Sequence, residues 1–120
     1  MKYPTSVTIC GYIYQIEYVE TPLEVDDDFA PGHWLGQCCG NTIRVLATQE
    51  PFGILDTLIH EILHAVFNKH PMLKQALQSA DTEEPFINTL AMELANLLTQ
   101  NGWATTKKQP TITHRISQEA

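Results

Sequence analysis

The sequence predicts a single α+β domain, and three observations carry that prediction. At 120 residues the chain is long enough for one hydrophobic core and too short for two. Strand patterns fill its first half, whereas its second half carries apolar residues at helical spacing. The last residues, 105–120, are polar and weakly patterned. We therefore expect residues 1–104 to form the domain and the remainder to be a flexible C-terminal tail.

Two segments of the first half are predicted strands. Residues 7–19 are rich in β-branched and aromatic side chains, which predicts one strand or a hairpin bent near Gly11. Residues 43–48 predict a second strand. The intervening residues 20–32 have loop composition, with three consecutive aspartates and two prolines, and residues 33–41 are rich in turn formers.

Three helices are predicted in the second half. The first covers residues 54 to about 67 and is apolar on more than one face, so it is expected to be mostly buried. A short helix is expected over residues 72–78. The third begins at a cap, Asp81 or Thr82, and keeps apolar residues at helical spacing until a glycine stops it.

The first of these helices contains the run His60-Glu61-Ile62-Leu63-His64. Residues four apart lie on the same helical face, so His60 and His64 can hold one ion together. Two neutral imidazoles suit Zn²⁺, and Glu61, which is not a ligand, can take a proton from zinc-bound water. This is the H-E-x-x-H pattern of zinc metallopeptidases. Burying these polar groups without partners would be costly, and a metal ion satisfies them at once.

The third ligand is expected to be Glu84, at the start of the last helix. Catalytic zinc sites usually take three protein ligands. Nineteen residues separate His64 from Glu84, which is enough chain for a turn, a short helix and a return. The last helix would then pack antiparallel to the first and aim its carboxylate at the ion. Asn88, one turn later, would be placed to hydrogen-bond a ligating histidine.

A second possibility for the third ligand is His70, ten positions after His60. The run then resembles the metzincin motif, with Phe67 where that motif has glycine. Glycine serves there because the chain must leave the helix sharply, in a backbone conformation that bulky residues resist. Glu83 and Glu93 are weaker candidates for the third ligand, judged by their positions in the sequence.

Residues 57–66, followed by Glu83-Glu84 and Leu90-Ala91, resemble the small HExxH zinc metallopeptidases encoded by bacteriophages and prophages. The spacing from His64 to Glu84 is similar to that of thermolysin-like gluzincins. More distantly, the last helix resembles the ligand-bearing helix of ImmA/IrrE-type peptidases. The resemblance implies a minimal zincin-like domain, in which a small twisted β-sheet packs on an active-site helix and a second, ligand-bearing helix.

The composition argues against several other classes of protein. A formal net charge of -7, with seven lysines and arginines, does not suit a nucleic-acid-binding surface. No segment has the length and apolar character of a signal peptide or a membrane span, so we expect a cytoplasmic protein without membrane contact. Three cysteines without paired Cys-x-x-Cys motifs are expected to be reduced thiols.

These observations predict a zinc-dependent metallopeptidase that acts on a protein or peptide substrate. His60, His64 and Glu84 would bind Zn²⁺, and Glu61 would be the general base. Residues 43–48 are expected to bind the substrate by strand pairing at a sheet edge. One alternative is a non-catalytic zinc-binding interaction protein with a closed, four-ligand site. Another is a binder whose acidic loop, residues 24–28, docks a basic partner. The sequence leaves the oligomeric state open.

Overall fold

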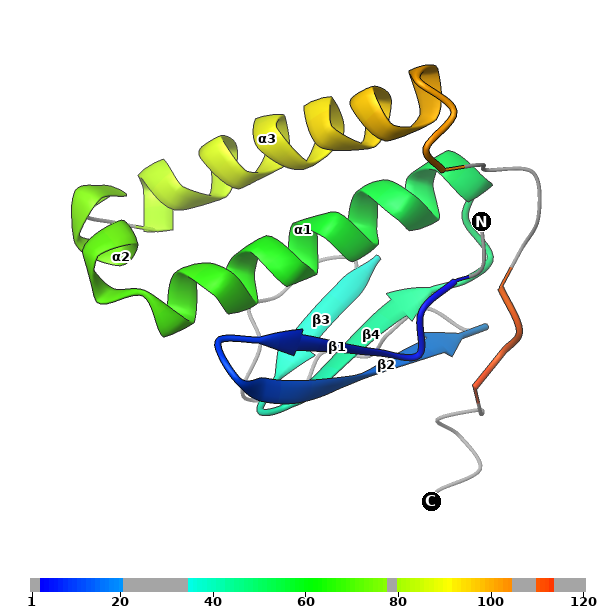
Figure 1. Ribbon diagram of the computed structural model, residues 1–120, viewed down its shortest axis with the longest axis horizontal. Coiled ribbons are helices and arrows are strands. Elements are labelled where there is room, and N and C mark those ends of the chain that lie inside the picture. Colours follow the sequence, from blue (N-terminus) through cyan, green and yellow to red (C-terminus); the bar gives the residue numbers. More distant parts are fainter. Residues whose placement is uncertain (1–2, 21–34, 78–79, 105–109, 114–120) are drawn as a thin grey trace.

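The structure is a computed structural model that describes residues 3–20, 35–77, 80–104 and 110–113. It has an α+β fold, as the sequence predicts, with one four-stranded sheet and three helices (Figure 1). The elements along the chain are β1 (Ser6–Ile9), β2 (Tyr12–Val19), β3 (Gly36–Cys39), β4 (Thr42–Leu46), α1 (Pro51–Lys69), α2 (Pro71–Leu77) and α3 (Ala80–Gln100).

Two hairpins supply the four strands. β1 and β2 join through Cys10 and Gly11, both at positive φ (52° and 82°), which is the backbone of a two-residue hairpin turn. The predicted bend near Gly11 is therefore confirmed as a hairpin. β3 and β4 form the second hairpin, with Gly40 in its turn at φ 59°. No strand was predicted within residues 33–41, but β3 forms there, because pairing with β4 outweighs the weak strand propensity of its glycine and glutamine.

The sheet has the order β1-β2-β4-β3, with β2 parallel to β4 and the other pairs antiparallel. β4 therefore has a hydrogen-bonded neighbour on each side. Our expectation that residues 43–48 bind substrate at a sheet edge was wrong, since both edges of β4 are occupied. Among the described strands, β3 forms the edge on that side.

The main core lies between the sheet and α1. Alternate residues of β2 and β4 point to the helix, and the parallel register sets Ile16 beside Ile43 and Tyr18 beside Val45. From α1, Ile54, Leu58 and Ala65 complete this cluster. α1 also packs against α3, which runs back antiparallel to it (Figure 1).

The contact between α1 and α3 uses small residues on one side and large residues on the other. Ala95 of α3 is completely buried and packs with Leu55 of α1, while Ile59 and Leu98 lie at the margin of the same cluster. A side chain as small as alanine at such a contact lets the two helix backbones come near each other. α1 is thus fixed from both the sheet and α3.

Both long helices begin earlier than the sequence predicts. α1 begins at Pro51, ahead of the predicted start at residue 54, and proline is suited to this place because the first position of a helix needs no backbone N–H partner. α1 ends at Lys69, where the N–H of His70 donates to the carbonyl of Phe67 at 3.1 Å, and Pro71 then opens α2. α3 is already helical at Ala80, ahead of the expected cap.

Part of the expected C-terminal tail packs against the sheet. Thr113 and Tyr18 exchange two hydrogen bonds of 2.8 Å, one through each backbone N–H, and Pro110 is buried. The acidic loop of residues 24–28 and the rest of the tail lie outside the described residues. In the part of the chain that the structure describes, no helix combines the length and apolar character needed to cross a bilayer.

Candidate metal centre

α1 presents the two histidines of the motif on the face that looks toward α3. Their ring centroids are 4.7 Å apart, the ring planes are inclined by 61°, and the two Nε2 atoms are 3.1 Å apart. This is the arrangement that residues four apart on a helix should give. Both side chains are about four-fifths buried, with exposures of 19% and 22%.

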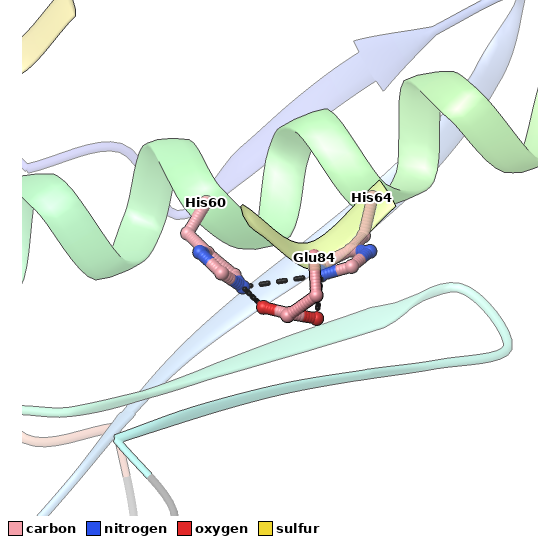
Figure 2. Close-up of side chains that lie close together, drawn as sticks. All are labelled: His60, His64 and Glu84. Atoms are coloured by element: carbon pink, nitrogen blue, oxygen red, sulfur yellow. Dashed lines mark hydrogen bonds and ion pairs between the residues drawn. The ribbon is translucent and has the colours of Figure 1, made fainter. Parts of the chain in front are cut away.

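α3 brings Glu84 to the same point, and Figure 2 shows the carboxylate and the two rings directed toward one another. Glu84 Oε1 lies 2.8 Å from Nε2 of His60, and Oε2 lies 3.2 Å from Nε2 of His64. Glu84 itself is half exposed, so one side of the group is open to solvent. Among the described residues, these three form the group whose ligand atoms all lie within 4.8 Å of one another.

The three residues suit a small divalent cation. Two imidazole nitrogens and a carboxylate oxygen are ligands that Zn²⁺ takes, and such atoms around a tetrahedral zinc ion lie about 3.4 Å apart. The contacts from 2.8 to 3.2 Å are slightly shorter than that, so small side-chain movements would accommodate the ion. Three converging groups with lone pairs, partly removed from water, are costly unless a proton or a cation lies among them. Their chemistry therefore fits zinc.

His60 is held in the protonation state that a ligand needs. Burial lowers the pKa of His60 below its ordinary value, and the neighbouring His64 lowers it further. The carboxylates of Glu84 and Asp56 oppose this shift without reversing it. Neutral imidazole is the form that coordinates a metal.

Glu61 lies on a different side of α1, turned toward the sheet, and is 8% exposed. Burial, and then the charge of Glu84, raise the pKa of Glu61 to about 7. A carboxyl group with that pKa can accept and release a proton near neutral pH. Glu61 is outside the group of three residues whose possible ligand atoms converge.

β3 passes very close to Glu61, at Gly36. A Cβ atom on Gly36 would lie 3.1 Å from Oε2 of Glu61, 3.0 Å from its Cγ and 2.6 Å from Cγ2 of Thr57. Only a residue without a side chain fits there. Sequence reasoning did not select Gly36, although a glycine inside a strand often marks a close backbone approach.

Thr57, one turn before Glu61, is itself fixed by hydrogen bonds. Its hydroxyl donates to Oε1 of Gln49 at 3.2 Å, and Nε2 of Gln49 donates to the carbonyl of Leu46 at 2.8 Å. The methyl group of Thr57 therefore remains directed at Gly36. These hydrogen bonds connect the end of β4 to Thr57, and the methyl group of Thr57 in turn limits how closely β3 can approach α1 near Glu61.

His70 is not brought to the histidine pair. α1 continues as a helix to Lys69, so His70 comes about 15 Å further along the axis than His60. Its Nε2 lies 3.0 Å from Sγ of Cys10, in the turn between β1 and β2. The structure thus shows no metzincin-like grouping with His70 among the described residues.

The sequence also suggested Glu83 and Glu93 as ligands and Asn88 as a hydrogen-bond partner of a ligand. Glu83 pairs with Lys74, and Glu93 is exposed further along α3. Asn88 is exposed, and in the described part of the chain no hydrogen bond joins it to either histidine.

Comparisons with known proteins give no relative: no protein-family model, curated protein or solved structure matches this chain. The chemistry of the site is therefore the guide to its function.

Glu61→Gln is expected to change how the stability of the metal-free protein depends on pH. The folded state keeps the Glu61 proton up to a pKa of about 7, against an ordinary value of 4.5. The contribution of the protonated carboxyl is therefore complete below about pH 4.5 and is lost as the pH rises to about 7, by up to roughly 3 kcal/mol. Glu61→Gln should not lose stability over this pH range. At pH 8 its free energy of unfolding should therefore be larger than that of the wild type.

Denaturant unfolding with a chelator present, between pH 5 and 8, measures this difference. The shift at His60 is common to both proteins, so comparing them isolates Glu61 to a first approximation. Glu93→Gln, an exposed change of the same kind, should unfold in parallel with the wild type. Parallel curves for Glu61→Gln would contradict burial of this carboxyl group.

Gly36→Ala is expected to destabilise the protein by about 1–3 kcal/mol, the usual cost of overpacking. The new Cβ would meet Cγ2 of Thr57 at 2.6 Å, so β3 or α1 must move. Adding Thr57→Ser removes that methyl group and keeps the hydroxyl for Gln49. The double variant should recover much of the lost stability in denaturant unfolding, and purely additive losses would show that this contact is not the cause.

Proposed function

We propose that this protein is a zinc-dependent metallopeptidase with a zincin-like domain of the small HExxH type. The observation that carries the proposal is the convergence of His60, His64 and Glu84 beside the buried Glu61. Within the described residues three ligand side chains converge, which is the number typical of catalytic zinc sites. Closed structural sites use four.

Each residue has a distinct role in this proposal. His60, His64 and Glu84 would hold Zn²⁺, and two neutral ligands with one anionic ligand would leave the site a net positive charge. When bound, Zn²⁺ supplies Lewis acidity, which polarises a peptide carbonyl and makes water acidic enough to ionise near neutral pH. Glu61 would accept the proton from the attacking water and deliver it to the leaving amine. Burial raises the pKa of Glu61 in the metal-free protein, whereas the charge of a bound dication would lower it, so the metal would favour the carboxylate form that accepts this proton.

In this proposal the substrate-binding strand is β3, not β4 as expected from the sequence. β3 is the edge of the described sheet and contacts Glu61 at Gly36. A peptide that lies in an extended conformation beside Gly36 would pass close to the Glu61 carboxylate. The proposed substrate is therefore a protein or peptide segment in an extended conformation.

Removing a ligand is expected to abolish stable zinc binding. The purified protein should bind one zinc ion per chain, and Glu84→Gln should weaken binding by at least about 100-fold, more than the loss of a group that only orients a ligand. Glu93→Gln changes a glutamate of the same helix away from the site and should bind normally. Metal analysis and competition with a chelator measure both. A wild-type protein that stays empty in excess zinc would end the proposal.

Glu61→Gln is expected to separate binding from catalysis. The variant should keep its zinc, because Glu61 is not in the ligand group, and lose about 100-fold or more of its peptide hydrolysis. Hydrolysis is followed with denatured protein and generic peptide substrates on zinc-loaded samples. Undiminished activity in this variant would remove Glu61 from the mechanism.

A further inference from the structure

The segment between the two ligand-bearing helices has little apolar packing. α2 starts directly after the cap of α1, and none of its seven residues is buried. Met72 is 83% exposed and Leu73 is 39% exposed. Burial of apolar surface therefore contributes little to holding α2 in place, and polar contacts become more important.

The described ion pair between α2 and α3 joins Lys74 to Glu83. Nζ of Lys74 lies 3.3 Å from Oε1 and 3.2 Å from Oε2 of Glu83, so the ammonium group faces both carboxylate oxygens. The Glu83 side chain is 11% exposed, whereas that of Lys74 is 48% exposed. A carboxylate so far removed from water needs a charged or hydrogen-bonding partner, and Lys74 supplies it.

Glu83 is the immediate neighbour of the ligand Glu84. Successive residues of a helix point about 100° apart, so one carboxylate faces α2 while the other faces the histidines of α1. Rotation of α3 about its axis would move both together. Ile87, fully buried one turn further on, fixes the same part of the helix by apolar packing.

We propose that Lys74 is a positioning residue for the metal centre. By holding Glu83, it orients the first turns of α3 so that Glu84 reaches the metal and Glu83 is kept from it. This inference rests on the zinc site proposed above, and it concerns how that site is assembled rather than its reaction.

The test is the zinc affinity of Lys74→Met, compared with that of Lys69→Met. Both variants remove one positive charge, but Lys69 lies at the end of α1, 4.0 Å from the centre of the Tyr12 ring. Removing a cation near a cation site should, by charge repulsion alone, tighten zinc binding. Loss of positioning should instead weaken it, by about 10-fold, as for groups that orient a ligand. Loss of charge repulsion and loss of positioning thus predict changes of opposite sign in the zinc affinity of Lys74→Met.

Competition with a chelator gives the zinc dissociation constants, and the visible spectrum of the Co²⁺-substituted protein reports the ligand geometry. Lys74→Met should weaken zinc binding and alter the Co²⁺ spectrum. Lys69→Met should do neither. Lys74→Arg, which can also pair with both oxygens of Glu83, should restore affinity to within about threefold of the wild type.

Glu83→Gln tests the same pair from the other side and keeps the inference testable if Lys74→Met does not fold. Loss of the negative charge alone would also weaken zinc binding, so this variant is judged by its Co²⁺ spectrum, which should be altered if the pair positions Glu84. An unaltered spectrum would count against the positioning role. Normal zinc affinity in folded Lys74→Met, or equal weakening in Lys69→Met, would overturn the positioning role and leave the zinc site standing. A wild-type protein without zinc affinity would overturn the proposed function and, with it, this inference.

Discussion

The contact between the first turns of α3 and the middle of α1 is the constraint on which the proposed site depends. There the carboxylate of Glu84 meets the imidazoles of His60 and His64 at 2.8 and 3.2 Å. Three such groups do not gather in a partly buried place without a cation or a proton to relieve them. The buried contact between Ala95 and Leu55 holds the two helices close enough for this to happen.

Two sides of α1 present different residues of the motif to different neighbours. One side carries His60 and His64 toward α3, and the neighbouring side carries Glu61 toward the sheet. Because adjacent residues differ by about 100° in direction, a single helical turn serves both partners. The proposed metal ligands are thereby held by helix packing, whereas burial against the sheet raises the pKa of Glu61. Changes in β3 can thus alter the proposed base without contacting a proposed ligand.

Much of the fold was predictable because it follows from local patterns. The α+β class, the first hairpin and the three helices all come from apolar periodicity and turn residues. β3 was not predictable, since its pairing with β4 rather than its own propensity makes it a strand. The central place of β4 was missed for the same reason: strand order is decided by long-range pairing. The first helix was predicted to start at residue 54, whereas α1 begins at Pro51.

Local sequence is enough to place His60, Glu61 and His64 on one turn of a helix, because helical geometry fixes the relation between residues that are four apart. Which of Glu84, Glu83 and His70 lies against the two histidines depends on the packing of the helices, and in the structure it is Glu84. Nineteen residues separate His64 from Glu84, and such a connection is compatible with many rotations of α3. The rotation that places Glu84 against the histidines depends on the packing of α3 against α1 and on the ion pair of Glu83 with Lys74. Neither contact can be predicted from local sequence.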